Sequence, residues 1–250
     1  MKCVEYGPGN GPAVMLLHGG GLSWWNYREA AELLQTDCRV ILPILDGHAG
    51  SDRPFTTIED NAEELLAYID ERLNGSLLLL GGLSLGAQVL LEMLSRRGDL
   101  CRFALVESAM VLPSPLTRAL IGPAIGSSFG LIRRRWFARL QFQSLHIRPE
   151  LFGDYYRDTC RIAKADMIAF MKANAAYELK DSLRQCRAKT LLYAGSRETR
   201  GIRRSAELLR ENLPDCTLTI LPGSRHGDFS LNHTQDYVSA IRSALKQAGV

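Results

Sequence analysis

Six short apolar runs alternate along the chain with longer segments of helical period. The runs cover residues 13–17, 39–45, 76–80, 102–106, 190–194 and 217–221. Runs of this length that are apolar on both faces are typical of buried parallel strands. The helical segments cover residues 24–34, 58–73, 85–96, 202–213 and 237–246. This alternation predicts an α/β fold: a mostly parallel central sheet with helices on both faces and an active site at the carboxyl ends of the strands.

One connection between the predicted strands is far longer than the others. It runs from residue 107 to 189, and a structureless loop of that length is rare in a compact domain. Its composition predicts several helices, among them 131–142 and 155–177, with breaks at four prolines: Pro113, Pro115, Pro123 and Pro149. We therefore expect a helical cap of residues 108–189, inserted into a core made of residues 1–107 and 190–250.

The composition indicates a folded globular chain. Of its 250 residues, 46% are apolar and 23% are charged, and the formal net charge is only +3. No stretch reaches the ~18 apolar residues of a transmembrane segment, and the first residues lack a secretory signal, so we expect a cytoplasmic protein. The six cysteines are scattered without a C-x-x-C pair, which favours reduced thiols over disulfides or a zinc site. We therefore expect no metal.

A serine lies between two glycines where a predicted strand passes into a helix. The sequence Gly82-Leu83-Ser84-Leu85-Gly86 follows the strand 76–80 and opens the helix 85–96. A serine on such a sharp turn is held in a strained conformation with its hydroxyl above the sheet, and flanking glycines avoid collisions. A helix N-cap serine behind a glycine-rich turn would explain Ser84 but not both glycines. The pattern favours Ser84 as a nucleophile.

A glycine loop, His18-Gly19-Gly20-Gly21, ends the first central strand. In a parallel sheet this loop lies beside the turn that carries Ser84, where the amide of Gly20 can join that of Leu85 to hold an oxyanion. Neither G-x-x-x-x-G-K-[ST] nor G-x-G-x-x-G occurs in the chain, so nucleotide binding is not expected.

His226 is the predicted general base. It lies in Pro222-Gly223-Ser224-Arg225-His226-Gly227, just after the last strand and at the same edge of the sheet as Ser84. The other histidines have less suitable positions: His18, His48, His146 and His233. Three carboxylates compete to orient the imidazole: Glu198 after the strand 190–194, which we favour, Glu107 at the end of the strand 102–106, and Asp228.

The order of glycine loop, Gly-x-Ser-x-Gly, acid and histidine resembles that of the α/β-hydrolase superfamily over nearly the whole chain. The segment Asp46-Gly47-His48-Ala49-Gly50-Ser51 also resembles that family's Pro-Gly-His-Gly-x-Ser turn, with two departures. The resemblance implies that Ser84 is the nucleophile, His226 the base, and the amides of Gly20 and Leu85 the oxyanion hole. Glu198 stands where the family usually has Asp. Only about a dozen residues precede the first central strand, so we expect the family's outermost N-terminal strand to be missing.

These residues predict a serine hydrolase that cleaves a carboxylic ester or thioester through an acyl-enzyme, without cofactor or metal. A carbon–carbon bond hydrolase or lyase of the same fold, and a non-catalytic small-molecule receptor, stay as alternatives. The expected partner is a small-molecule acyl substrate, not nucleic acid. The acyl chain, the leaving group and the oligomeric state do not follow from the sequence.

The predicted cap carries most of the positive charge. Residues 108–188 hold 13 Lys or Arg against 6 Asp or Glu. On the predicted helix 131–142, three apolar side chains recur at four-residue spacing and should cover the catalytic pocket: Ile132, Trp136 and Leu140. Arg134 and Arg135 turn partly away from that face. Three roles stay open for the cap arginines: a solvated face, attraction of an anionic substrate, or contact with an anionic membrane.

Overall fold

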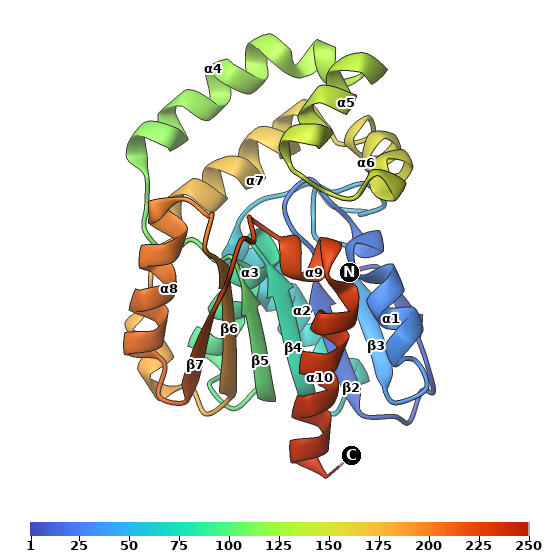
Figure 1. The fold of residues 1–250 in the computed structure, drawn as a ribbon, viewed down its shortest axis with the longest axis vertical. Helices are drawn as coiled ribbons and strands as arrows, with labels where there is room; N and C mark the ends of the chain where they lie inside the picture. The colour runs from blue at the N-terminus through green and yellow to red at the C-terminus, as the bar shows by residue number, and fades with distance from the viewer. Residues whose placement is uncertain (250) are drawn as a thin grey trace.

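One sheet of seven strands forms the centre of the computed structural model, which describes residues 1–249 (Figure 1). The strands lie in the order β1-β3-β2-β4-β5-β6-β7, and all neighbours pair in parallel except β1 with β3. Their bounds are β1 Cys3–Tyr6, β2 Ala13–Leu17, β3 Arg39–Pro43, β4 Leu77–Leu83, β5 Cys101–Glu107, β6 Lys189–Gly195 and β7 Cys216–Leu221. The loops that follow β2, β4, β5, β6 and β7 therefore open at the same edge of the sheet.

The short strand β1 forms the N-terminal edge of the sheet. Its residues pair antiparallel with β3, with Cys3 opposite Pro43 and Tyr6 opposite Val40. A strand of four residues can form here because each of its residues has a partner in β3. An ion pair between Glu5 and Arg39, at 2.8 Å, also joins the two strands. Edge strands are often this short, and the expectation that the family's outermost N-terminal strand is missing stays a prediction.

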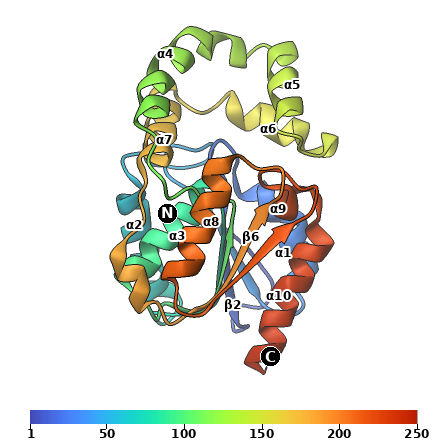
Figure 2. The same ribbon diagram turned by 60° about the vertical axis from the view of Figure 1, so that its left-hand side comes forward.

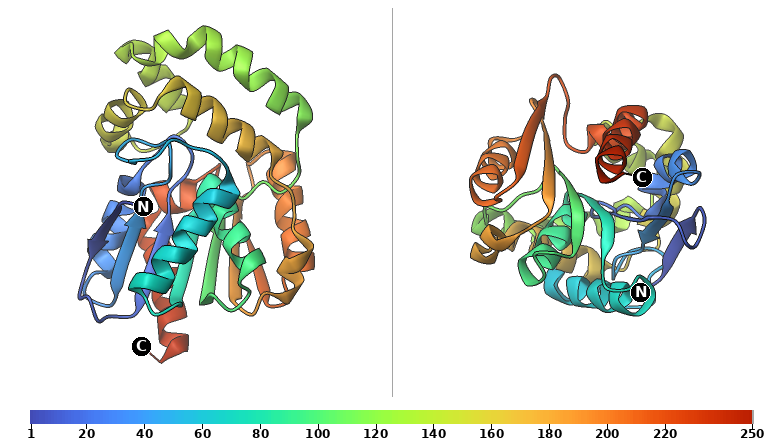
Figure 3. Two further views of the ribbon diagram at one scale, coloured as in Figure 1. Left: turned by 180° about the vertical axis from the view of Figure 1, so that it is seen from behind. Right: turned by 90° about the horizontal axis from the view of Figure 1, so that it is seen from below.

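Helices cover both faces of the sheet, as predicted (Figure 3). Successive strand side chains point to opposite faces, so Val14 and Leu16 enter one apolar core while Met15 and Leu17 enter the other. The first core is completed by the turn η1 (Trp24–Tyr27) and by α1 (Arg28–Leu34), α9 (Asp228–Asn232) and α10 (Thr234–Ala248). The second is completed by α2 (Ile58–Arg72), α3 (Leu85–Arg96) and α8 (Arg200–Asn212).

The segment between β5 and β6 lies over the carboxyl ends of the strands (Figures 1 and 2). It contains α4 (Pro115–Ile132), α5 (Arg135–Ser144), η2 (Pro149–Leu151), α6 (Phe152–Thr159), α7 (Lys164–Ala176) and η3 (Asp181–Gln185). Helix α4 is outermost, and α7 lies between it and the sheet. The site described below is thus enclosed from above by this segment.

The helix boundaries in this segment differ from those predicted. The expected helix 131–142 is broken after Ile132, because Arg134 takes an extended conformation with φ −88° and ψ 117°. The expected helix 155–177 is broken between α6 and α7. Conversely, α4 continues through Pro123, which lies on an exposed side of the helix. Neither break contains glycine or proline, so the packing of the helices, and not a local signal, decides where they end.

The predicted division into a core of residues 1–107 and 190–250 and a cap of residues 108–189 stays a prediction. The last part of that segment runs back along the core, where the N–H of Arg187 donates to the carbonyl of Gly98 at 2.7 Å. Among the helices formed by residues 1–249, none has both the length and the apolar character needed to cross a bilayer.

Candidate active site

Ser84 occupies a strained turn between β4 and α3. Its backbone has φ 54° and ψ −111°, a left-handed conformation that a residue with a side chain adopts at a cost of roughly 1–3 kcal/mol. Both flanking glycines are needed for close packing. A Cβ at Gly86 would lie 2.1 Å from the carbonyl oxygen of Leu17, and one at Gly82 would lie 2.6 Å from the backbone of Gly86. The turn therefore has the geometry expected from the sequence.

The glycine loop brings two unoccupied backbone donors to the same place. A Cβ built on Gly20 would lie 3.5 Å from the Cβ of Leu85, so the two residues are in contact distance. Within residues 1–249, neither the N–H of Gly20 nor that of Leu85 donates a hydrogen bond. Leu85 is also the first residue of α3, where the helix dipole favours negative charge. Both N–H groups are thus free to hold an oxyanion beside Ser84.

Two buried histidines support this loop. Nε2 of His18 accepts the N–H of Leu45 at 3.1 Å, and Nε2 of His48 accepts the N–H of Gly21 at 3.0 Å. Burial lowers the pKa of His18 to about 3 and that of His48 to about 4, so both rings are neutral near pH 7. In both histidines Nε2 already accepts a backbone N–H, so these rings hold the loop in place and are poorly suited to act as the general base.

His226 and Glu198 meet at the carboxyl ends of β6 and β7. Nδ1 of His226 lies 2.9 Å from Oε2 of Glu198, whose side chain is fully buried while that of His226 is 49% exposed. Burial acts to raise the pKa of Glu198, but its interactions with His226, together with hydrogen bonds from Gly195 and Ser108, hold the pKa below its usual range. A buried charged acid therefore faces an accessible imidazole.

The other two candidate acids have different partners. Oε1 of Glu107 accepts the N–H groups of Phe229 and Ser230, at 3.1 and 3.2 Å, near the start of α9. Burial raises the pKa of Glu107 to about 7. Oδ2 of Asp228 accepts the N–H of Arg225 at 2.7 Å. Of the three carboxylates, Glu198 is the one that the fold brings to His226.

Ser108 is a site residue that the sequence did not single out. Its hydroxyl donates to Oε1 of Glu198 at 2.8 Å and accepts the N–H of Gly227 at 3.4 Å. It is buried and has φ 58°, directly after the last residue of β5. The available signal was its position, because β5 lies between the strands that end at Ser84 and at Glu198.

Ser84 and His226 together line two adjoining hollows under the cap helices. The first, of about 290 Å³, we call the cap hollow; it is mostly apolar and includes Leu85, Tyr155, Met167, Phe170 and Met171. The second, of about 320 Å³, we call the loop hollow; it is likewise mostly apolar, and Leu22, Ile147 and Leu231 line it together with Ser144, Arg197 and Arg225. Leu145 at the end of α5 lines both of them.

Two arginines and one carboxylate line the loop hollow: Arg197, Arg225 and Glu198. Arg197 and Arg225 directly precede Glu198 and His226, and both side chains are exposed. No carboxylate of residues 1–249 forms an ion pair with either guanidinium. These two arginines lie next to the candidate catalytic residues and outside the segment 108–189, whose arginines had attraction of an anionic substrate as one of three open roles.

The predicted apolar face of the cap does not cover the site. Ile132 is buried at the end of α4, while Trp136 and Leu140 on α5 are exposed. The break at Arg134 places Ile132 on a different helix from the other two, so their four-residue spacing no longer defines one face. Gln141 and Leu145 are the residues of this region that reach the cap hollow.

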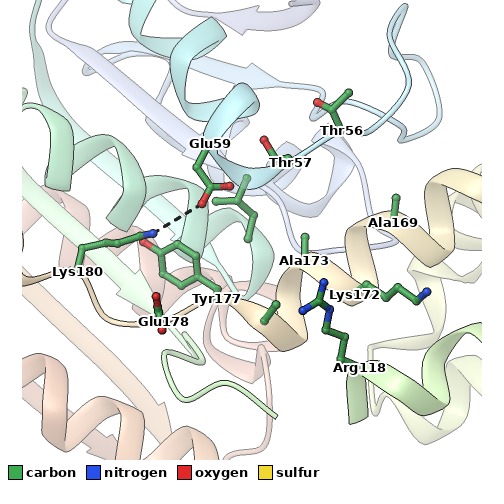
Figure 4. Close-up of a pocket in the computed structure, with 12 residues that line it drawn as sticks. Thr56, Thr57, Glu59, Arg118, Ala169, Lys172, Ala173, Tyr177, Glu178 and Lys180 are labelled. Carbon is green, nitrogen blue, oxygen red and sulfur yellow. Dashed lines mark ion pairs between the residues drawn. The ribbon is translucent and has the colours of Figure 1, made fainter. Parts of the chain in front are cut away.

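A separate hollow of about 360 Å³ lies between α2, α4 and α7 (Figure 4). Arg118 of α4 and Lys172 of α7 line it, and Lys180 pairs with Glu59 across it at 3.7 Å. No histidine, serine or cysteine is among its lining residues. It therefore lacks the nucleophile and base that are present around Ser84.

The fold of the chain is shared with known hydrolases. The model of the alpha/beta hydrolase family matches residues 14–240. An esterase from Thermogutta terrifontis has a TM-score of 0.81 at 20% identity, over 98% of this chain and 93% of that one. An esterase from Exiguobacterium antarcticum has a TM-score of 0.81 at 20% identity, over 98% and 94%. MenH from S. aureus has a TM-score of 0.78 at 15% identity, over 100% and 98%. No curated protein matches the sequence.

Proposed function

The chain belongs to the alpha/beta hydrolase family, and from this premise we propose that it is a serine hydrolase acting on a carboxylic ester or a thioester. The hydrogen bond between Glu198 and His226 carries the proposal. It joins a buried carboxylate to a half-exposed imidazole that lines the same two hollows as Ser84. A nucleophile, a base and an orienting acid are the groups that acyl transfer to serine requires.

In the proposed reaction, the hydroxyl of Ser84 attacks the acyl carbon and its proton passes to Nε2 of His226. Nε2 is the nitrogen available for this step, because Nδ1 faces Glu198, whose charge stabilises the imidazolium. The N–H groups of Gly20 and Leu85 hold the oxyanion. The proton then goes to the departing alcohol or thiol, and a water activated by His226 hydrolyses the acyl-enzyme to a carboxylic acid and free Ser84.

The two hollows divide the substrate between them in this proposal. The cap hollow, with Met167 and Phe170 in its wall, suits an apolar acyl chain, because burial there removes hydrocarbon from water. The loop hollow then takes the leaving group. Arg197 and Arg225 favour a leaving group that carries a carboxylate or a phosphate, which guanidinium groups bind in a charge-assisted way.

Labelling with a fluorophosphonate tests the nucleophile. We expect the probe to label the wild-type protein and a Ser144→Ala variant but not Ser84→Ala; Ser144 is a matched control because it lines the loop hollow. Turnover of p-nitrophenyl esters and acyl thioesters of increasing chain length then separates ester from thioester preference. Undiminished labelling of the Ser84→Ala protein would overturn the assignment. If the probe labels Ser84 but the protein hydrolyses none of these substrates, the alternative of a non-catalytic small-molecule receptor is favoured.

A further inference from the structure

The outer surface of α4 and α5 exposes large apolar side chains. The exposed fractions are 72% for Leu116, 57% for Leu120, 41% for Leu131, 60% for Trp136 and 58% for Leu140. Elsewhere in residues 1–249, only three other large apolar side chains are comparably exposed: Leu145, Met171 and Ile220. Apolar side chains gathered on one part of a soluble surface mark an interaction site.

Four exposed arginines lie in α5 and in the turn that joins it to α4: Arg133, Arg134, Arg135 and Arg139. The ion pairs formed within residues 1–249 include none of the four, and no Asp or Glu occurs in the sequence between Glu107 and Glu150. The guanidinium of Arg133 lies 5.9 Å from the ring of Phe129, and that of Arg139 lies 5.2 Å from the ring of Phe152. Aromatic rings thus position these two arginines, but no carboxylate neutralises them. We call the five apolar side chains and these four arginines the cap surface.

We propose that the cap surface binds an anionic phospholipid membrane. This inference goes beyond the proposed function and does not depend on it. Helix α4 is the outermost element of the molecule, on the side of α7 away from the sheet (Figures 1 and 2). The side chains of the cap surface are exposed. Leucine and tryptophan side chains enter the boundary between head groups and acyl chains, while arginines bind lipid phosphates and follow the negative surface potential.

Charge argues against a second copy of the chain as the occupant. A two-fold dimer places the same patch of each copy against the other. Such an interface would enclose four arginines from each copy with no carboxylate of the cap surface to pair with them, and charges removed from solvent are screened little by salt. An anionic bilayer offers opposite charge and an apolar interior at the same surface, so it complements both components of the cap surface.

Co-sedimentation with vesicles tests the proposal on the full-length protein. We expect binding to vesicles that contain phosphatidylglycerol and little binding to phosphatidylcholine alone, with binding weakened by high salt. Replacing Arg133, Arg134 and Arg135 together by Gln should weaken binding by roughly a hundredfold, because each arginine near the surface contributes about 1 kcal/mol. Trp136 fluorescence should shift to shorter wavelength on binding, and the shift should be absent in Trp136→Phe.

A matched triple variant controls for the loss of charge. Replacing Arg200, Arg203 and Arg204 by Gln removes the same charge from exposed positions of α8 and should leave vesicle binding nearly unchanged. Equal losses in both triple variants, or no binding to anionic vesicles, would overturn the proposal. If the wild-type protein forms a dimer and the Arg133, Arg134 and Arg135 triple variant is a monomer, the cap surface binds a second copy instead. If the protein captures an acidic protein but does not bind vesicles, the cap surface binds that partner instead. The measurement uses no substrate, so its failure is separate from a failure of the esterase proposal.

Discussion

The hydroxyl of Ser108 donates to Oε1 of Glu198 at 2.8 Å, on the carboxylate oxygen that His226 does not contact. Gly195 donates its N–H to the same oxygen at 2.9 Å. With one oxygen held by two donors, the carboxylate cannot rotate freely, and Oε2 stays directed at the imidazole. Ser108 therefore acts on the proposed base through Glu198, as a positioning residue.

Removing the hydroxyl of Ser108 should lower kcat without raising KM. Ser108→Gly is the preferred variant, because the residue has φ 58°, a conformation that glycine adopts without strain. A hydrogen bond to a charged group is worth about 1.5–3 kcal/mol, so kcat should fall roughly tenfold to a hundredfold. Steady-state kinetics on one p-nitrophenyl ester measures the split between the two constants. A purely structural role would instead reduce the fraction of active protein and leave the kcat of titrated sites unchanged.

Replacing Glu198 by Gln should be far more damaging to catalysis than replacing Glu107 by Gln. The first substitution removes the charge that stabilises the imidazolium, and kcat should fall by a factor on the order of 10²–10⁴. Glu107 contacts the N–H groups of Phe229 and Ser230, and its glutamine analogue can still accept them. Parallel kinetics on the two variants compares them directly. If Glu107→Gln loses more activity, the orienting acid has been assigned to the wrong strand.

Glu107 should make the protein less stable as pH rises from about 4.5 to about 7. Burial raises its pKa from 4.5 to about 7, so between these values the folded protein binds a proton that the unfolded chain releases. Stability from this group is present below the unfolded pKa and is lost as pH rises through the folded pKa. Urea unfolding of wild type and Glu107→Gln should show the variant gaining on the order of 3 kcal/mol, relative to wild type, over this range. A difference in unfolding free energy that does not change with pH would contradict the prediction.

Arg197 and Arg225 should select for an anionic leaving group. Replacing both by Gln should raise KM roughly tenfold for an ester with a carboxylate or phosphate on its alcohol, because two charge-assisted contacts are lost. KM for a neutral ester of the same chain length should change little. The Arg133, Arg134 and Arg135 triple variant serves as the control, since none of these residues lines either hollow. Equal effects of the Arg197/Arg225 substitutions on both esters would exclude this role.

The sequence by itself determined most of the sheet and the local features of the site. Six parallel strands follow from short apolar runs, because the central strands are buried on both faces and need apolar side chains at every position. The edge strand β7 is an exception, since none of its residues is fully buried. The turn at Ser84 follows from Gly82 and Gly86, since a Cβ at either would collide with backbone. His226 follows from its place after the last strand. Each of these signals is local, so it can be recognised without knowing the neighbours in space.

Only the tertiary structure decided how distant segments meet. The pairing of β6 between β5 and β7 brings Glu198 to His226, turns Glu107 toward α9, and adds Ser108, which no motif marks. The pairing of β1 with β3 likewise depends on a partner strand that lies far along the chain. The helix break at Arg134 is not marked by glycine or proline in the sequence. It leaves Trp136 and Leu140 exposed on α5 instead of over the site. Contacts between residues far apart in sequence depend on the free energy of the whole fold. A local pattern of residues therefore cannot predict them.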